Sequence, residues 1–372
     1  MSKYLKKKGA PIFLRILKVV LISLLACSAL LLAFYLSKLD RITYADEVEQ
    51  MYAAQETEVA IPTELSGATI EPVESADNEE EYQVAVDDLE FIENPEVPEG
   101  EVQQSNAVFN ILLIGTDERT TKYNKNARAD SMILVSIDKN NHTVKLVSLE
   151  RGIGVPILEG EYEGQYDLLT HVFRWGGADL LVKTVEHCFK IDVNHYVRVN
   201  FAAVEKIVDA VGGIDIVLTK KEAEGLNLWA LEGDDLVKTG DNRMDGNTAL
   251  RYARLRWIDS DWQRVERQRK VILAVVDEVK DASLIKINNL ADEVLPLVQT
   301  NLTKMEITEL LLYAPNFLRS EFDQMTIPKK GTYGGMSIRN GGGAFAVDYT
   351  INNDLLYRFL YEGVSSEELL AE

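Results

Sequence analysis

Three short apolar segments decide the fold class: FNILLIG at 109–115, SMILVSI at 131–137 and TVKLVSL at 143–149. Each is short, rich in β-branched residues and bounded by turn-forming residues, which predicts buried β-strands. The second and third segments are joined by DKNNH at 138–142. This sequence is typical of a hairpin turn, so we predict that these two strands pair in the antiparallel sense.

The following residues alternate between helical and extended patterns. FAAVEKIVDAVGG at 201–213 and RVERQRKVILAVVDEVK at 264–280 have the apolar spacing of amphipathic helices. ALRYARLRW at 249–257 alternates in polarity and predicts a strand. Because strands and helices interleave to the end of the chain, we predict one large α/β domain over residues 106–372.

The N-terminal part of the chain resembles a signal anchor. Residues 1–18 form a basic segment with six Lys or Arg and no acid, and an uncharged stretch of about eighteen residues follows. The positive-inside rule then predicts a single transmembrane anchor at 19–38, with a cytoplasmic N-terminus and an extracytoplasmic domain at the cell membrane. The alternatives are a cleaved signal peptide and acylation of Cys27. Continued apolar sequence beyond Cys27 favours the anchor.

Residues 39–105 differ in composition from the rest. Between 46 and 101 there are 19 Asp or Glu and no Lys or Arg. Such a segment buries too little apolar surface to offset its chain entropy, so we predict a disordered acidic stalk. The domain at 106–372 is also net negative, with 31 cations and 40 anions, and shows no helix-turn-helix pattern. Both features argue against nucleic-acid binding.

The predicted hairpin brings charged residues to one edge of the sheet. Asp117 follows the first strand, Arg128 and Asp130 precede the second, and Arg151 follows the third. If the first strand runs parallel to the third, all four lie at the same edge. Carboxylates suit Mg²⁺, and guanidiniums suit phosphate oxygens. The alternative for the two aspartates is an ordinary role in turns and helix caps.

A second cationic group lies at 251–270, where RYARLRWIDSDWQRVERQRK holds seven Lys or Arg and three carboxylates. In a strand, Arg254 and Arg256 would share one face. A cationic cluster in a net-negative domain predicts a site for a specific anion, and we expect a pyrophosphate. The alternative is that these arginines form surface ion pairs with Asp259 or Asp261.

The helix that follows contributes Arg264, Arg267 and Gln268, which lie at i, i+3 and i+4 on one face. The sequence contains no Ser–His–Asp set, CxxC pair or HExxH helix, and its four histidines lack metal-ligand spacing. NGGG at 340–343 lacks the Lys and Ser or Thr of a phosphate-binding loop and predicts a hairpin turn.

Taken together, these blocks resemble the LytR–CpsA–Psr family. The resemblance is carried by NILLIGTDER, ARADSMILVSID and VKLVSLER within 110–151, HYVRVNFAAVEKIVDAVGGIDI at 195–216, MDGNTALRYARLRWIDSDWQRVERQRKVI at 244–272, and IPKKGTYGGMSIRN at 327–340. It implies an α-β-α sandwich around a central mixed sheet, with a hydrophobic tunnel for a prenyl tail. It also implies an Mg²⁺-dependent phosphotransferase that moves a glycopolymer from an undecaprenyl-pyrophosphate carrier onto peptidoglycan.

The resemblance assigns a role to each candidate residue. Asp117 and Asp130 would hold the metal and act in catalysis together with Arg151. The pyrophosphate would be bound by Arg128, Arg151, Arg254, Arg256, Arg264, Arg267 and Gln268. One departure is clear: the family usually has Pro-Arg-Asp after the third strand, and this chain has Glu150-Arg151-Gly152. A second hypothesis therefore stays open, a non-catalytic scaffold that binds polyprenyl phosphate or wall glycan.

Overall fold

The computed structural model describes residues 33–48, 50–51, 84–86, 88–93, 95–118, 124, 126–230, 235–280, 282–320 and 322–372. The predicted basic segment and residues 19–32 of the predicted anchor lie outside this set, as does the stretch 52–83 of the predicted stalk. Within the described residues, no helix combines the length and apolar character needed to cross a membrane.

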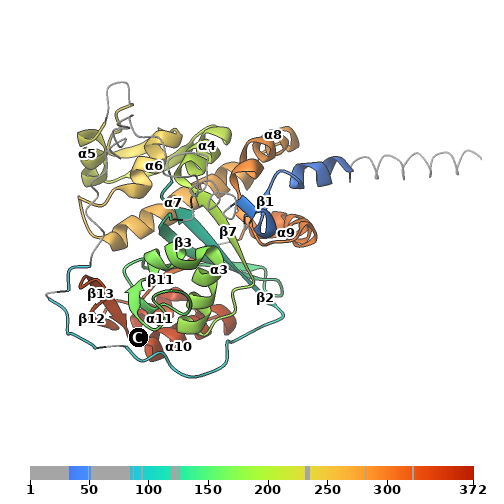
Figure 1. Ribbon diagram of the computed structural model, residues 1–372. Helices are drawn as coiled ribbons and strands as arrows, with labels where there is room; N and C mark the ends of the chain where they lie inside the picture. Colours follow the sequence, from blue (N-terminus) through green and yellow to red (C-terminus); the bar gives the residue numbers. More distant parts are fainter. Residues whose placement is uncertain are drawn as a thin grey trace, which may run out of the picture.

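A mixed seven-stranded sheet forms the centre of the domain (Figure 1). It contains the three strands predicted from the apolar segments. In spatial order the strands are β1 (Thr43–Tyr44), β10 (Gln299–Thr300), β7 (His195–Asn200), β2 (Val108–Thr116), β3 (Ala129–Asp138), β4 (Thr143–Leu149) and β11 (Phe322–Ile327).

The pairing of β2, β3 and β4 confirms the predicted hairpin. β3 pairs with β4 in the antiparallel sense, with Met132 opposite Leu149. β2 also pairs antiparallel to β3, with Gly115 opposite Ser131, so β2 runs parallel to β4. The ends of β2 and β4 and the start of β3 therefore lie at one edge of the sheet, as the sequence predicts.

Alternation along the strands builds a core on each face of the sheet. Leu112 and Ile114 pack into one cluster, and Ile111 packs into the other. The first cluster is covered by α3 (Leu169–Phe189), α10 (Tyr349–Tyr361) and α11 (Ser366–Ala371), and the second by α7 (Asp261–Lys280) and α9 (Lys304–Phe317). This arrangement agrees with the predicted α-β-α sandwich.

Smaller units extend this sandwich. A separate core joins α4 (Phe201–Ala210), β8 (Ile214–Leu218), α5 (Lys220–Leu228), β9 (Gly240–Met244), α6 (Gly246–Arg254) and α8 (Leu284–Val294). Two hairpins are formed by β5 (Gly154–Pro156) with β6 (Tyr166–Leu168), and by β12 (Tyr333–Ser337) with β13 (Gly343–Val347). The second confirms that the NGGG sequence lies in a hairpin turn.

The predicted strand at 249–257 is wrong, because α6 occupies most of it. Asp245 caps this helix by accepting a hydrogen bond from the backbone N of Thr248 at 2.9 Å. Ala249, Tyr252 and Ala253 are buried at helical spacing. Positions 249, 252 and 253 lie on one face of a helix. The N-terminal cap further favours the helix over the strand that the alternating polarity had predicted.

The prediction of a disordered stalk is wrong for the parts of 39–105 that the structure describes. Leu39 and Ile42 are buried, and β1 pairs with β10 in parallel. Further along, Val84 is buried and donates its backbone N–H to the carbonyl of Gly343 at 3.2 Å. Composition averages over the whole segment and therefore misses a few apolar residues that each fill a site on the domain.

We predict that Leu39→Ala lowers the free energy of unfolding by about 2–5 kcal/mol, because it leaves a cavity under the N-terminal segment. Leu36→Ala is the matched control, since Leu36 is 37% exposed and Leu39 only 2%. We expect it to change the free energy by no more than about 0.5 kcal/mol. Urea unfolding of the full chain in detergent measures both. If both variants leave the free energy of unfolding unchanged, the N-terminal segment does not pack on the domain, as the stalk prediction holds.

Candidate active site

The first predicted pair forms where β2 ends. The Asp117 carboxylate accepts two hydrogen bonds from Arg128, one from its backbone N and one from Nε, both at 3.0 Å. The backbone N of Asp117 also donates to the carbonyl of Arg128 at 3.3 Å. These three bonds close the loop between β2 and β3 and hold a carboxylate beside a guanidinium at the sheet edge.

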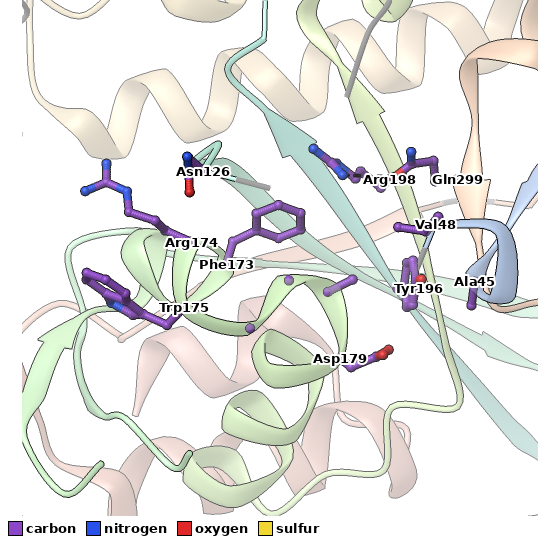
Figure 2. Close-up of a pocket in the computed structure, with 13 residues that line it drawn as sticks. Ala45, Val48, Asn126, Phe173, Arg174, Trp175, Asp179, Tyr196, Arg198 and Gln299 are labelled. Atoms are coloured by element: carbon purple, nitrogen blue, oxygen red, sulfur yellow. Dashed lines mark hydrogen bonds between the residues drawn. The ribbon is translucent and has the colours of Figure 1, made fainter. Parts of the chain in front are cut away.

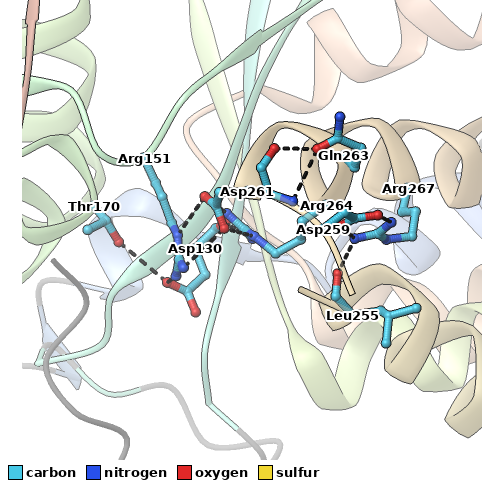
Figure 3. A network of polar contacts seen from close by, with 10 residues as sticks. Asp130, Arg151, Thr170, Leu255, Asp259, Asp261, Gln263, Arg264 and Arg267 are labelled. Carbon is cyan, nitrogen blue, oxygen red and sulfur yellow. Dashed lines mark hydrogen bonds and ion pairs between the residues drawn. The ribbon is translucent and has the colours of Figure 1, made fainter. Parts of the chain in front are cut away.

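A larger network of ion pairs and hydrogen bonds is centred on Asp261 (Figure 3). Arg151, which follows β4, donates from Nη1 to Oδ1 of Asp130 at 2.9 Å. Its Nε and Nη2 donate to the two oxygens of Asp261 at 3.1 and 3.3 Å. Nε and Nη2 of Arg264 also donate to the two carboxylate oxygens of Asp261, at 2.6 and 2.7 Å. Its Nη1 reaches the backbone carbonyl of Asp130 at 2.9 Å.

Burial makes this network electrostatically strong. The side chains of Arg151 and Arg264 are 4% and 5% exposed. Burial alone would raise the pKa of Asp130, but the charges of Arg151, Arg264 and Arg128 outweigh it and lower that pKa below its ordinary value. Asp130 is therefore ionised at neutral pH. Arg128 and Asp130 are two residues apart at the start of β3, which links the two groups of residues along the chain.

Glu150 places a second carboxyl group beside Asp261. Its side chain is fully buried, and burial raises its pKa well above the usual range, with a further contribution from the neighbouring Asp261 carboxylate. Asp261 shifts the opposite way. Burial would raise its pKa, but the hydrogen bonds and positive charge of Arg264, with the charge of Arg151 and the neighbouring Glu150, hold it well below the ordinary range. The two shifts are opposite because two neighbouring buried carboxyl groups cannot both ionise easily.

The remaining predicted residues divide into two groups. Arg267 donates to both oxygens of Asp259 at 2.8 and 2.7 Å and also to the carbonyl of Leu255. Its guanidinium is thus occupied in holding the 255–260 loop on α7, and we exclude it from the pyrophosphate group. Arg254 lies 4.7 Å over the ring of Phe201.

Arg256 and Gln268 are the candidates with unused hydrogen-bonding groups. Both are half-buried, and neither side chain makes a hydrogen bond to another residue in the described ranges. The predicted shared strand face of Arg254 and Arg256 does not exist, because α6 ends at Arg254 and the chain continues in an extended conformation at Leu255. Arg254 therefore ends a helix, and Arg256 lies in the chain that follows it.

Sequence reasoning missed the residue that connects the network. Asp261 was considered only as a surface partner for Arg254 or Arg256, yet it bridges Arg151 and Arg264. Its position three residues before Arg264 in the first turn of a helix is a signal for an ion pair. Thr170, whose hydroxyl lies 3.5 Å from Asp130, carried no signal, because its approach depends on how α3 packs.

The carboxylates fit a phosphate-bound magnesium ion better than a fully protein-bound metal. Among the described residues, no three His, Cys, Asp or Glu side chains gather closely enough to hold a metal. Mg²⁺ is commonly held by one or two carboxylates, with substrate phosphate and water completing its octahedron. The ionised Asp130 and the neighbouring Asp117 therefore fit this group, provided that a phosphate is bound with it.

A cavity of about 420 Å³ lies between α3 and the sheet (Figure 2). Phe173 lines it, and Thr170, which lies one turn earlier on α3, contacts Asp130. Gly177, at φ +65°, kinks the helix beside it. The other lining residues are Ala45, Val48, Asn126, Arg174, Trp175, Gly176, Ala178, Asp179, Tyr196, Arg198 and Gln299.

The buried Glu150 predicts a specific dependence of stability on pH. Its pKa is higher in the folded chain, so above about pH 4.3 the folded state keeps a proton that the unfolded state has released. The retained proton makes the free energy of unfolding fall as pH rises toward the pKa of folded Glu150, by at most about 1.4 kcal/mol per pH unit. Glu150→Gln has no carboxyl group to titrate. The free energy of unfolding of this variant, relative to that of wild type, should therefore increase with pH.

Urea unfolding between pH 5 and 8 measures this difference. The control is Glu159→Gln, because the side chain of Glu159 is 60% exposed and its stability curve should run parallel to that of wild type. A Glu150→Gln curve that also runs parallel to wild type would show that Glu150 is not protonated in the folded chain.

Comparisons with known proteins agree with this geometry. The model of the LytR_cpsA_psr family matches residues 71–356, more than half of the chain. The chain is 32% identical over 224 residues to a polyisoprenyl-teichoic acid–peptidoglycan teichoic acid transferase, TagU, of Bacillus cereus, covering 59% of this chain and 69% of that protein. It is 34% identical over 180 residues to TagT of Bacillus subtilis, covering 48% and 54%.

Solved structures show the same fold. A structure of TagT bound to LIIa-WTA matches with a TM-score of 0.57 and 27% identity, covering 70% of this chain and 92% of that one. A crystal structure of Bacillus subtilis TagV matches with a TM-score of 0.55 and 28% identity, covering 72% and 99%. Because the family model matches more than half of the chain, the chain belongs to the LytR–CpsA–Psr family.

Proposed function

We propose that this chain is a phosphotransferase that moves a glycopolymer from an undecaprenyl-pyrophosphate carrier onto peptidoglycan. The observation that carries the proposal is the buried network of Asp130, Arg151, Asp261 and Arg264 beside the Asp117–Arg128 pair. Relatives named as teichoic acid transferases support the same reaction class.

The guanidiniums of Arg151 and Arg264 suit a diphosphate because they are buried and already oriented. Arg151 and Arg264 are held by Asp261, so little ordering remains to be done when phosphate oxygens arrive. Arg256 and Gln268 supply donors that are not used within the described part of the chain. Arg128 and Arg254 complete the proposed cationic lining.

In the proposed reaction, a peptidoglycan hydroxyl attacks the phosphorus that carries the glycan. A new P–O bond forms to the acceptor, the P–O bond to the lipid phosphate breaks, and polyprenyl phosphate leaves. Mg²⁺ held by Asp117 and Asp130 would neutralise negative charge on the diphosphate. The hydroxyl proton passes to a carboxylate of the site. Neighbouring arginines lower the pKa of Asp130, which makes that residue a weak base.

The cavity beside α3 is the proposed entry for the lipid tail. Val48, Phe173 and Tyr196 give part of its wall an apolar character. Its volume and mixed lining suit the first isoprene units and do not suit a complete undecaprenyl chain. We further propose that the predicted anchor holds the domain on the outer side of the cell membrane, within reach of the lipid carrier.

The replacement of the usual Asp by Gly152 is the observation that favours the alternative, a non-catalytic scaffold. Asp261 weakens this alternative, since it supplies Arg151 with the bidentate carboxylate partner that the missing residue could have provided. Arg151 therefore keeps two carboxylate partners, Asp130 and Asp261, without an acidic residue at position 152, and we favour catalysis.

The decisive experiment is glycan transfer with lipid-linked glycan, peptidoglycan and Mg²⁺. We expect Asp130→Asn to lower kcat by about 10²–10³-fold, the usual effect of removing one preorganised electrostatic group. Asp354→Asn is the control, because Asp354 lies on α10 with a side chain 63% exposed, and it should keep full activity. EDTA should abolish transfer and added Mg²⁺ should restore it. A wild-type chain that binds the lipid without any transfer would establish the scaffold.

A pair of arginine variants tests which guanidiniums bind phosphate. We expect Arg256→Ala to weaken binding of farnesyl pyrophosphate at least about tenfold, the loss of roughly 1.4 kcal/mol, without changing the free energy of unfolding. Arg267→Ala should instead lower the free energy of unfolding, by up to about 3–5 kcal/mol, because it breaks a buried ion pair. Calorimetric titration and urea unfolding measure the two effects. The opposite pattern would contradict our division of the arginines.

A further inference from the structure

The N-terminal segment leaves the domain at a fixed place. The chain is helical at 33–39 and then enters β1, which is paired with β10. Tyr35 lies 3.2 Å from the hydroxyl of Thr308 on α9, while Arg41 donates to Asp292 on α8 at 2.6 Å. Figure 1 shows this helix emerging between α8 and α9. Strand pairing and side-chain bonds therefore set where any preceding membrane anchor meets the domain.

Among the described residues, the same two helices carry large apolar side chains that are mostly exposed. Met305 and Leu312 on α9 are 80% and 76% exposed, and Ile285 on α8 is 76% exposed. Folded soluble domains rarely gather such side chains on one surface, and those that do usually present an interaction site. Additional exposed apolar residues on this surface are Phe34, Leu36, Ile287 and Leu311.

Helical spacing places these residues on the side from which the chain leaves. Met305 and Leu312 lie three residues before and four residues after Thr308, the contact of Tyr35. Ile285 lies seven residues, or two turns, before Asp292, the contact of Arg41. The exposed apolar residues thus flank the exit of the N-terminal segment on two different helices.

We propose that the outer faces of α8 and α9, together with Phe34, form a membrane-docking surface that rests in the outer leaflet of the bilayer. The occupant follows from the chain itself, because the uncharged stretch at 19–36 precedes this exit and would place lipid beside it. This surface is separate from the proposed transfer site. Its role is to fix the height and tilt of the domain above the membrane.

The charges around the surface are compatible with docking on lipid. Asp292 is paired with both Lys38 and Arg41, and Asp40 is paired with Lys304. These carboxylates are therefore neutralised and do not repel an anionic leaflet. Because the anchor would hold the domain at high effective concentration near the bilayer, even a weakly binding apolar surface would stay docked.

Spin labels on single cysteines in the full chain test the proposal in lipid nanodiscs of phosphatidylglycerol and phosphatidylethanolamine. The background is Cys27→Ser. Cys188 can remain, because burial raises the pKa of its thiol to about 12 and prevents labelling. Labels are placed at Leu312→Cys and Met305→Cys. The matched control is Leu228→Cys on α5, because Leu228 is 75% exposed and its helix lies apart from α9 in Figure 1.

The readout is the collision rate of each label with oxygen and with a water-soluble nickel chelate. Docking predicts high oxygen and low nickel accessibility at positions 305 and 312, with the reverse at 228. High nickel accessibility at 305 and 312 would overturn the proposal. So would low accessibility to both reagents, which indicates burial against a protein, or a lipid-type signal at 228 equal to that at 312. A chain that is not retained in nanodiscs also overturns it. None of these outcomes depends on transferase activity.

Discussion

The rest of the site depends on one interaction, in which the carboxylate of Asp261 binds two buried guanidiniums. Arg151 and Arg264 come from the end of a strand and the start of a helix, and Asp261 binds both. Removing one member of such a buried group usually costs about 3–5 kcal/mol, because the remaining charge loses its partner. The strand order, the start of α7 and the position of Glu150 must all be compatible with this arrangement. In the proposed function, the diphosphate is bound by guanidiniums that Asp261 already holds in place.

The sequence predicted the sheet edge because its signals are local. Three apolar runs and one tight turn define the hairpin, and the positions of Asp117, Asp130 and Arg151 follow from strand ends. The helix α6 was missed because short alternation and helical spacing coincide over nine residues, and the capping bond of Asp245 decides between them. The packing of residues 39–48 was missed because single buried side chains, such as Leu39, do not alter the composition of a long acidic segment.

The roles of individual side chains were harder to predict from the sequence than the positions of the strands. Neighbours on one helix face can have opposite roles: Arg264 faces the network, whereas Arg267 turns to Asp259 and the 255–260 loop. Helical periodicity alone cannot separate them, since the choice depends on where a carboxylate lies in the folded chain. The departure at Glu150 and Gly152 became interpretable only once Asp261 was seen to contact Arg151. Asp261, which lies far from Arg151 in the sequence, supplies this arginine with a carboxylate partner that residue 152 does not provide.

The N-terminal segment links the site to the expected source of its substrate. Ala45 and Val48 line the cavity beside α3, and a few residues earlier the same segment passes between α8 and α9. A lipid carrier would thus travel a short path from the bilayer to the arginines. The most direct test is a crystal structure of the protein with farnesyl pyrophosphate and Mg²⁺. Our account predicts phosphate oxygens bonded to Arg151 and Arg256, with the metal between Asp117 and Asp130. A diphosphate bound elsewhere, with the Arg151–Asp261–Arg264 contacts unchanged, would contradict it.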